Sequence, residues 1–187
     1  MSFIRAAVPA DVPAILSLIH DLAIYEKEPD AVRNTEEMLM QALFGTNPQI
    51  FAHVALEHEI DHDGRADAVT SVPAAGGSDA VMGFALWFLN YSTWEGTHGI
   101  YLEDLYVRPE ARGAGHGKAL LRTLAGIASD RGYARMEWSV LDWNAPSIRF
   151  YQGLGAAPMD GWSVFRLSGE ALASFGRLQA TAGEELR

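Results

Sequence analysis

Residues 112–118, Arg-Gly-Ala-Gly-His-Gly-Lys, form a glycine-rich segment with the spacing of an anion site. The segment follows an apolar run at 101–107 that is typical of a strand, and apolar residues with helical spacing follow it at 120–128. Glycine admits positive φ angles and lets the backbone come close to a ligand. Successive backbone N–H groups and the positive end of a helix then face one point, which suits a phosphate. The spacing therefore predicts a site for a phosphate-bearing ligand.

Three phosphate-binding patterns can be compared with this segment. A P-loop fails because Arg112 stands at its first glycine and Ala119 at its Ser/Thr position. A dinucleotide-binding turn fails because Lys118 stands at its last glycine and the segment comes late in the chain. The third pattern, Arg/Gln-x-x-Gly-x-Gly/Ala, is met by Arg112, Gly115 and Gly117, and it resembles the pyrophosphate turn of the GNAT-type N-acetyltransferases, which bind acetyl-CoA. A plain strand–helix turn is the alternative that this segment alone leaves open.

A second stretch, residues 144–156, resembles another segment of the same family. It matches the pattern Asn-x-x-(Ser/Ala)-x-x-(Phe/Tyr)-Tyr-x-x-x-Gly-(Phe/Ala). The resemblance implies that Asn144 hydrogen-bonds the cofactor or the backbone, and that Tyr151 lies near the thioester sulfur. With an ordinary pKa of about 10, a tyrosine stays protonated at neutral pH and can donate its proton to a leaving thiolate. A core tyrosine on an amphipathic helix is the competing interpretation.

The resemblance implies one set of residues for acetyl-CoA and no metal. In this set the backbone N–H groups of the glycine turn hold the pyrophosphate. The acetyl group passes directly to the amine, which agrees with the absence of cysteine from the chain. The implied cofactor-binding residues are Leu105, Val107, Arg112, Gly113, Gly115, Gly117, Lys118, Asn144, Ser147 and Tyr151.

Four shorter stretches, at 23–26, 90–96, 101–104 and 160–162, resemble the spermidine/spermine (diamine) N-acetyltransferases. The resemblance implies a small cationic amine as substrate, and Glu103 as the base that deprotonates it. Neighbours on a strand point to opposite faces, so Glu103 and Asp104 are not expected to share one pocket. Carboxylates and aromatic faces both attract ammonium groups. The implied substrate-binding residues are Tyr25, Glu26, Trp94, Glu103, Asp104 and Trp162.

One position departs from the polyamine pattern. Where those enzymes carry an acidic residue before Pro-Trp, this chain has Ser92 and Thr93. A carboxylate for a distal ammonium group is therefore missing, which favours a thialysine-type amino acid or another amine as the alternative substrate. An acyl-CoA-binding regulatory module without turnover is an alternative of another class, and the presence of both Glu103 and Tyr151 argues against it.

A zinc-site pattern, H-E-x-x-H, occurs at His58, Glu59 and His62. That pattern works on a helix, but the residues after Glu59 are poor helix formers. Ala68 stands where the longer zinc motif has its third histidine. We expect residues 58–79 to form a flexible polar loop, and a metallohydrolase remains the less favoured alternative.

The composition narrows the classes of partner. The chain has 14 Lys and Arg against 24 Asp and Glu, a formal net charge of −10, which argues against nucleic-acid binding. The apolar run at 81–89 is too short to cross a bilayer, and the first residues read as a strand, unlike a signal peptide. We therefore expect a cytoplasmic protein with no membrane partner, and the resemblance implies a homodimer.

The elements that must position these residues indicate an α/β fold in a single domain over 1–175, with a tail at 176–187. The resemblance implies a mixed, mostly antiparallel sheet flanked by helices, in which strands 100–107 and 136–141 splay and admit the pantetheine arm. Asp11 is the expected start of the first helix, and Asn34 with Glu37 that of the second. Strands are expected at 2–7, 50–57, 80–90, 100–107, 136–141 and 162–167, and further helices at 116–132 and 144–152, with a helix-prone tail.

Overall fold

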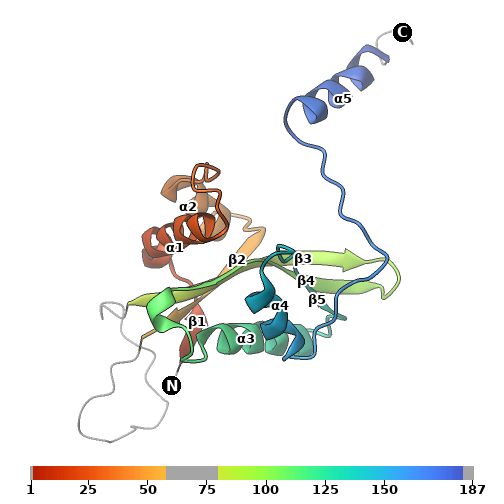
Figure 1. Cartoon of the computed structure of the whole chain (residues 1–187). Helices are drawn as coiled ribbons and strands as arrows, with labels where there is room; N and C mark the ends of the chain where they lie inside the picture. The colour runs from red at the N-terminus through yellow and green to blue at the C-terminus, as the bar shows by residue number, and fades with distance from the viewer. Residues whose placement is uncertain (1, 58–79, 183–187) are drawn as a thin grey trace, which may run out of the picture. The chain divides into compact units, whose positions relative to one another are not determined.

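The computed structural model describes residues 2–57 and 80–182 of the chain. A five-stranded sheet, in the order β1-β2-β3-β4-β5, organises the part up to Ser139 (Figure 1). Neighbouring strands are antiparallel except β4 and β5, which are parallel. This arrangement confirms the predicted mixed sheet. The strands are β1 (Phe3–Ala6), β2 (Ile50–Leu56), β3 (Val81–Ser92), β4 (Thr97–Val107) and β5 (Met136–Glu137).

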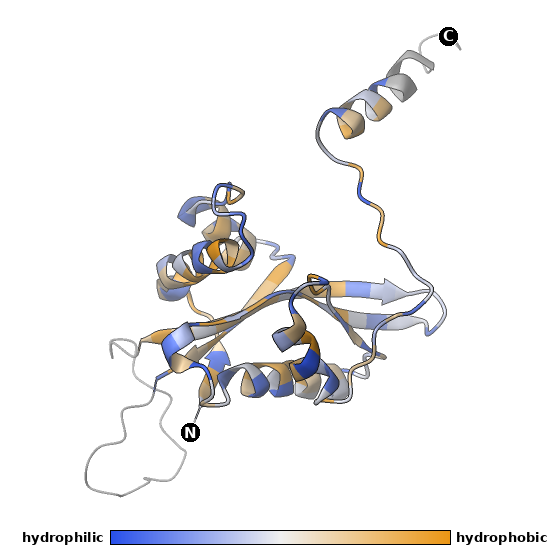
Figure 2. Ribbon diagram, in the orientation of Figure 1, coloured by the Kyte–Doolittle hydropathy of each residue, from blue (hydrophilic) through white to orange (hydrophobic). Residues whose placement is uncertain are grey.

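Helices cover both faces of this sheet. Helices α1 (Val12–Tyr25) and α2 (Glu36–Phe44) lie on one face, and α3 (His116–Asp130) lies on the other (Figure 1). Two short 3₁₀ turns flank these elements: η1 (Pro9–Asp11) leads into α1, and η2 (Pro109–Ala111) follows β4. Figure 2 shows the mixture of hydrophobic and hydrophilic residues along α1 and α3, as expected for helices with one buried face.

Capping differs in detail from the sequence prediction. Thr35, one residue beyond the expected Asn34, caps α2 because its Oγ1 accepts a hydrogen bond from the Met38 N–H at 3.2 Å. The Asp11 carboxylate makes no cap to α1; it accepts from the Val8 N–H at 2.8 Å and from Arg5 Nη2 at 2.9 Å. Asp11 therefore ties β1 to the start of α1, which fixes where the helix meets the sheet.

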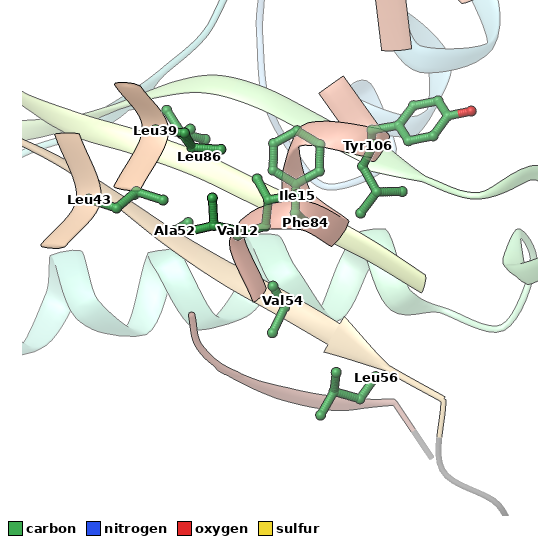
Figure 3. Packing of buried hydrophobic residues seen from close by; sticks show 11 residues of the cluster. Val12, Ile15, Leu39, Leu43, Ala52, Val54, Leu56, Phe84, Leu86 and Tyr106 are labelled. Atoms are coloured by element: carbon green, nitrogen blue, oxygen red, sulfur yellow. The ribbon is translucent and has the colours of Figure 1, made fainter. Parts of the chain in front are cut away.

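The larger core lies between α1, α2 and the sheet (Figure 3). Fully buried side chains from the two helices meet β2 and β3, and each contributes about 1.5–3 kcal/mol of burial free energy. Tyr106 of β4 lies at the edge of this cluster, with its hydroxyl pointing away from it. The core therefore holds β4 rigidly at the position where the candidate site residues begin. Its main members are Val12, Ile15, Leu18, Leu39, Leu43, Val54, Leu56, Phe84, Leu86 and Tyr106.

The last pair of strands separates early. β4 and β5 are in register only at Ile100↔Met136 and Tyr101↔Glu137, although β4 continues to Val107. The predicted strand over 136–141 is therefore too long, because the two strands diverge after two pairs. Within the described residues, the edge of β4 that faces away from β3 has no strand beside it from residue 102 onward. This agrees with the predicted splay of the two strands.

The remaining residues, from Val140 on, form a second compact unit. It contains α4 (Ala145–Gln152) and α5 (Gly169–Ala182). The predicted strand over 162–167 is wrong: these residues pair with no described strand, and Val164 and Phe165 are 88% and 95% exposed. In the part of the chain that the structure describes, no helix has the length and hydropathy needed to span a membrane. The division into a domain and a tail stays a prediction.

Candidate functional site

The glycine turn has the backbone geometry of an anion site. Gly113 and Gly115 have φ angles of 86° and 88°, a region that only glycine enters without strain. A Cβ atom at either position would meet nothing within 4 Å, so the space beside the turn is open. Gly115 is the N-cap of α3 and no side chain caps this end, so the first N–H groups of the helix face outward. This geometry fits the pyrophosphate of acetyl-CoA.

Arg112, just before the turn, is held by its neighbours. Its Nε donates to the carbonyl oxygen of Val107 at 3.0 Å. Its guanidinium carbon lies 5.2 Å from the centroid of the Tyr25 ring and 5.5 Å from that of the Tyr106 ring. Tyr25, predicted to bind the amine substrate, therefore contacts the residue that precedes the glycine turn.

A β-bulge lies in β4 at Glu103. Leu86 pairs with Asp104 and the next residue, Trp87, pairs with Leu102, so Glu103 has no partner of its own. Strict alternation is thereby interrupted, and Glu103 and Asp104 together lie opposite Leu86. The expectation that these two carboxylates occupy opposite faces stays a prediction: the bulge interrupts the alternation between them, and Glu103 is exposed whereas Asp104 is half-buried.

Three carboxylates interact around this bulge. The pKa of Asp104 is raised to about 6, first by burial and then by the negative charges of Glu103 and Glu26. Burial also raises the pKa of Glu26, the residue that ends α1. Such a group of carboxylates attracts a cation and carries the perturbed pKa values that are common at functional sites. We name Glu26, Glu103 and Asp104 the acidic cluster.

Ser92, the departure from the polyamine pattern, and the two predicted substrate tryptophans have other surroundings. Ser92 is 5% exposed, and its Oγ accepts from the Glu95 N–H at 3.1 Å, so it holds the turn between β3 and β4. Trp94 in that turn is 89% exposed. Trp162 belongs to the second unit and is 71% exposed there. The structure therefore groups Glu26, Glu103 and Asp104, and the predicted contacts of Trp94 and Trp162 with the amine stay predictions.

The second sequence motif has a clear local role. Asn144 is buried, and its Oδ1 accepts from the Ser147 N–H at 3.3 Å, so this asparagine caps α4. Tyr151 lies in the last turn of that helix and is half-buried. Their predicted contacts with the cofactor stay predictions.

The zinc-like pattern at His58, Glu59 and His62 lies outside the described residues. Among residues 2–57 and 80–182, no three His, Asp or Glu side chains are placed to hold a metal ion. Sequence reasoning also missed the bulge at Glu103 and the buried imidazole of His116, whose Nδ1 has no hydrogen-bond partner in the described structure. Only the register of the strands reveals the bulge.

Comparison with known proteins agrees with this geometry. Residues 34–156 match the model of the Acetyltransferase (GNAT) family. A thialysine N-epsilon-acetyltransferase of Bos taurus is 38% identical over 172 residues, which are 90% of this chain and 94% of that protein. An L-ornithine N5-acetyltransferase of Arabidopsis thaliana is 33% identical over 202 residues, covering 95% of this chain and 89% of that protein.

Solved structures share the fold. An integron cassette protein from V. cholerae superposes with a TM-score of 0.71 at 22% identity, over 94% of this chain and 98% of that one. An aminoglycoside acetyltransferase from a soil metagenome, in complex with sisomicin, gives a TM-score of 0.68 at 14% identity, over 90% and 97% of the two chains. The glycine turn, the mixed sheet and these relatives lead to one conclusion: the chain belongs to the acetyltransferase (GNAT) family and is an N-acetyltransferase.

Proposed function

We propose that the protein transfers the acetyl group of acetyl-CoA to a side-chain primary amine of a basic amino acid or to a short diamine. The acidic cluster in β4 and at the end of α1 is the observation that carries this proposal. It supplies negative charge for a cationic amine. Two relatives support the same substrate class, since their names give thialysine and L-ornithine, both basic amino acids.

The described residues fit acetyl-CoA as the acetyl donor. Backbone N–H groups of Gly113, Gly115, Gly117 and Lys118 would hold the pyrophosphate, because the turn has open space and an uncapped helix end. The free edge of β4, which includes Leu105 and Val107, would hold the pantetheine arm by backbone hydrogen bonds. The roles of Asn144, Ser147 and Tyr151 toward the cofactor come from the family resemblance.

Proton transfers at the amine and at the sulfur complete the proposed reaction. The substrate amine is an ammonium ion at neutral pH, and Glu103, exposed on β4, accepts its proton directly or through water. The free amine nitrogen then attacks the thioester carbon, so that a C–N bond forms and the C–S bond breaks. Tyr151 donates its phenolic proton to the departing sulfur, and the second proton lost by the nitrogen of the new amide returns through solvent to the Tyr151 phenolate. Glu26 and Asp104 hold the positive charge of the substrate nearby.

The proposal has two further features: a homodimer, which the resemblance implies, and a cytoplasmic location, which is the expectation drawn from the sequence. Polyamines are less favoured substrates than shorter amines, because Ser92 replaces an acidic residue and its hydroxyl is used by the hairpin turn. Polyamines should still be tested, because spermidine/spermine N(1)-acetyltransferase-like protein 1 of Homo sapiens is 33% identical to this chain.

A thiol-release assay tests the proposed function. The protein is incubated with acetyl-CoA and, in separate reactions, with thialysine, L-ornithine, a short diamine or spermine. We expect amine-dependent release of CoA thiol, with kcat/KM higher for the basic amino acids or the diamine than for spermine. If none of the four amines supports thiol release, the proposed activity is contradicted. A clear preference for spermine would contradict the proposed substrate class.

A further inference from the structure

We propose that the last turn of α1 couples acetyl-CoA binding to amine binding, through two arginines that tie it to the segment leading into the glycine turn. This inference rests on the proposed function and adds a positioning role for Arg108, Arg112, Asp21 and Tyr25. Its consequence is that Tyr25, which the resemblance assigns to the amine, acts mainly on the affinity for CoA.

The first tie joins Arg108 to α1. Arg108 follows β4 directly, and its Nη1 lies 3.3 Å from Asp21 Oδ2. Its Nε donates to the carbonyl oxygen of Val81 at 3.3 Å, which holds the same side chain against the start of β3. Both side chains of the ion pair are about one-third exposed, so the pair guides position more than it adds stability.

The second tie joins Arg112 to α1. The guanidinium of Arg112 faces the rings of Tyr25 and Tyr106, at 5.2 Å and 5.5 Å, within cation–π range. Its Nε is fixed by the Val107 carbonyl. Asp21 and Tyr25 are four residues apart and share one face of α1, while Arg108 and Arg112 are four residues apart across η2. The two ties therefore both join the last turns of α1 to the segment around η2.

Glu26 of the acidic cluster belongs to the same end of α1. Glu26 directly follows Tyr25 at the end of α1, and α1 packs against β4, the strand that carries Glu103 and Asp104. Its negative charge contributes to the raised pKa of Asp104. Any shift of the end of α1 therefore changes both the surroundings of Arg112 and the spacing of the acidic cluster. When the pyrophosphate binds at the glycine turn, Arg112 and Arg108 hold the end of α1 in the position at which Glu26 completes the cluster.

Such coupling must be reciprocal. If bound CoA strengthens amine binding by some factor, the amine strengthens CoA binding by the same factor. Arg112 is exposed, and a cation–π contact at an exposed site is worth a small multiple of thermal energy. The loss of one tie should therefore change affinities by about 2- to 5-fold, which calorimetry resolves.

Calorimetric titration with CoA, which lacks the acetyl group and cannot react, tests the proposal. Thialysine serves as the amine. Tyr25→Leu removes the aromatic face, whereas Tyr25→Phe keeps it and loses only the hydroxyl. Tyr91→Leu is a matched control, because Tyr91 packs edge-on against His98 near the end of β3, outside both ties.

For the wild-type protein we expect thialysine to lower the Kd for CoA. Tyr25→Leu should raise the Kd for CoA by about 2- to 5-fold and bring the coupling factor close to one. Its Kd for thialysine in the absence of CoA should change little. Tyr25→Phe and Tyr91→Leu should keep the wild-type Kd for CoA.

Two results would overturn the proposal: wild-type Kd for CoA in Tyr25→Leu, or no effect of thialysine on CoA binding by the wild-type protein. If Tyr25→Leu does not fold, as judged by its melting curve, Asp21→Asn decides. It breaks the Arg108 tie at nearly constant volume, and an unchanged coupling factor would refute the role of that tie. Absence of CoA binding by the wild-type protein would instead contradict the proposed function, so the two failures are distinguishable.

Discussion

Asp104 carries an unusual proton affinity for an aspartate, with a pKa of about 6 instead of 3.8. Burial costs the ionised form solvation, and the charges of Glu103 and Glu26 add repulsion. A bound ammonium group would relieve both penalties. The same residue therefore destabilises the free protein at neutral pH and favours a cationic ligand, a common compromise at functional sites.

The raised pKa of Asp104 predicts how stability depends on pH. Between pH 3.8 and about 6 the folded state binds the Asp104 proton more tightly than the unfolded state does, so its contribution to stability falls as pH rises through this window. Asp104→Asn should abolish this loss and stabilise the protein at pH 8 by about 1–3 kcal/mol. Melting curves of both proteins at pH 5 and pH 8 measure it. If the difference in stability between Asp104→Asn and the wild-type protein is the same at pH 5 and pH 8, the assigned pKa is contradicted.

Glu103 and Tyr151 should respond differently to removal of their acid–base function. Tyr151→Phe keeps the ring and removes only the proton donor, so kcat should fall by about 10²–10⁴-fold with little change in the KM for acetyl-CoA. Glu103→Gln removes the base, and its defect should shrink as pH rises because free amine becomes more abundant. Steady-state kinetics from pH 7 to 9.5 compare the two. A Glu103→Gln defect that is constant with pH would assign this residue to positioning the amine.

At the scale of elements, the connection from β4 to α3 joins the two half-sites of the proposed reaction. The bulge at Glu103 gathers carboxylates in the middle of β4, and the glycine turn follows the end of the same strand. The core beneath Tyr106 fixes the strand between them. Because both half-sites belong to one rigid connection, their spacing does not depend on a mobile loop.

Backbone conformation at Gly115 should matter more than side-chain size. Gly115→Ala places a Cβ atom on a residue with φ of 88°, which costs about 1–2 kcal/mol and displaces the N–H groups of the turn. We expect weaker acetyl-CoA binding by about 10-fold. Gly126→Ala is the matched control, since Gly126 lies exposed inside α3 with open space around it and should gain about 0.5–1 kcal/mol of stability without losing affinity. Equal affinity of the two variants would argue against the turn as the cofactor site.

Local patterns predicted local structure, and long-range pairing decided the rest. The helical spacing after residue 116 and the glycines at 113 and 115 predict the strand–turn–helix unit, because its conformation depends on adjacent residues. The bulge at Glu103 leaves no local mark, since it arises from the register with β3. Residues 162–167 are rich in apolar and aromatic residues, as in a strand, but a strand also needs a partner, and no described strand pairs with them.

At the scale of the whole molecule, charge is distributed in support of the proposed chemistry. The chain carries a net charge of −10, which attracts small cations in solution. The glycine turn instead attracts anions, through the positive end of α3 and the neighbouring Arg112 and Lys118. An anionic cofactor and a cationic amine are thus attracted by different parts of one protein.

Mass spectrometry of the reaction product tests the central claim most directly. The protein is given acetyl-CoA with an equimolar mixture of thialysine, L-ornithine, a short diamine and spermine, and the acetylated products are identified and counted against released CoA. The proposed function predicts one acetyl group on a side-chain or terminal amine for each CoA released, mostly on the amino acids or the diamine. Release of CoA without an acetylated amine, or acetylation of the α-amino group, would contradict it.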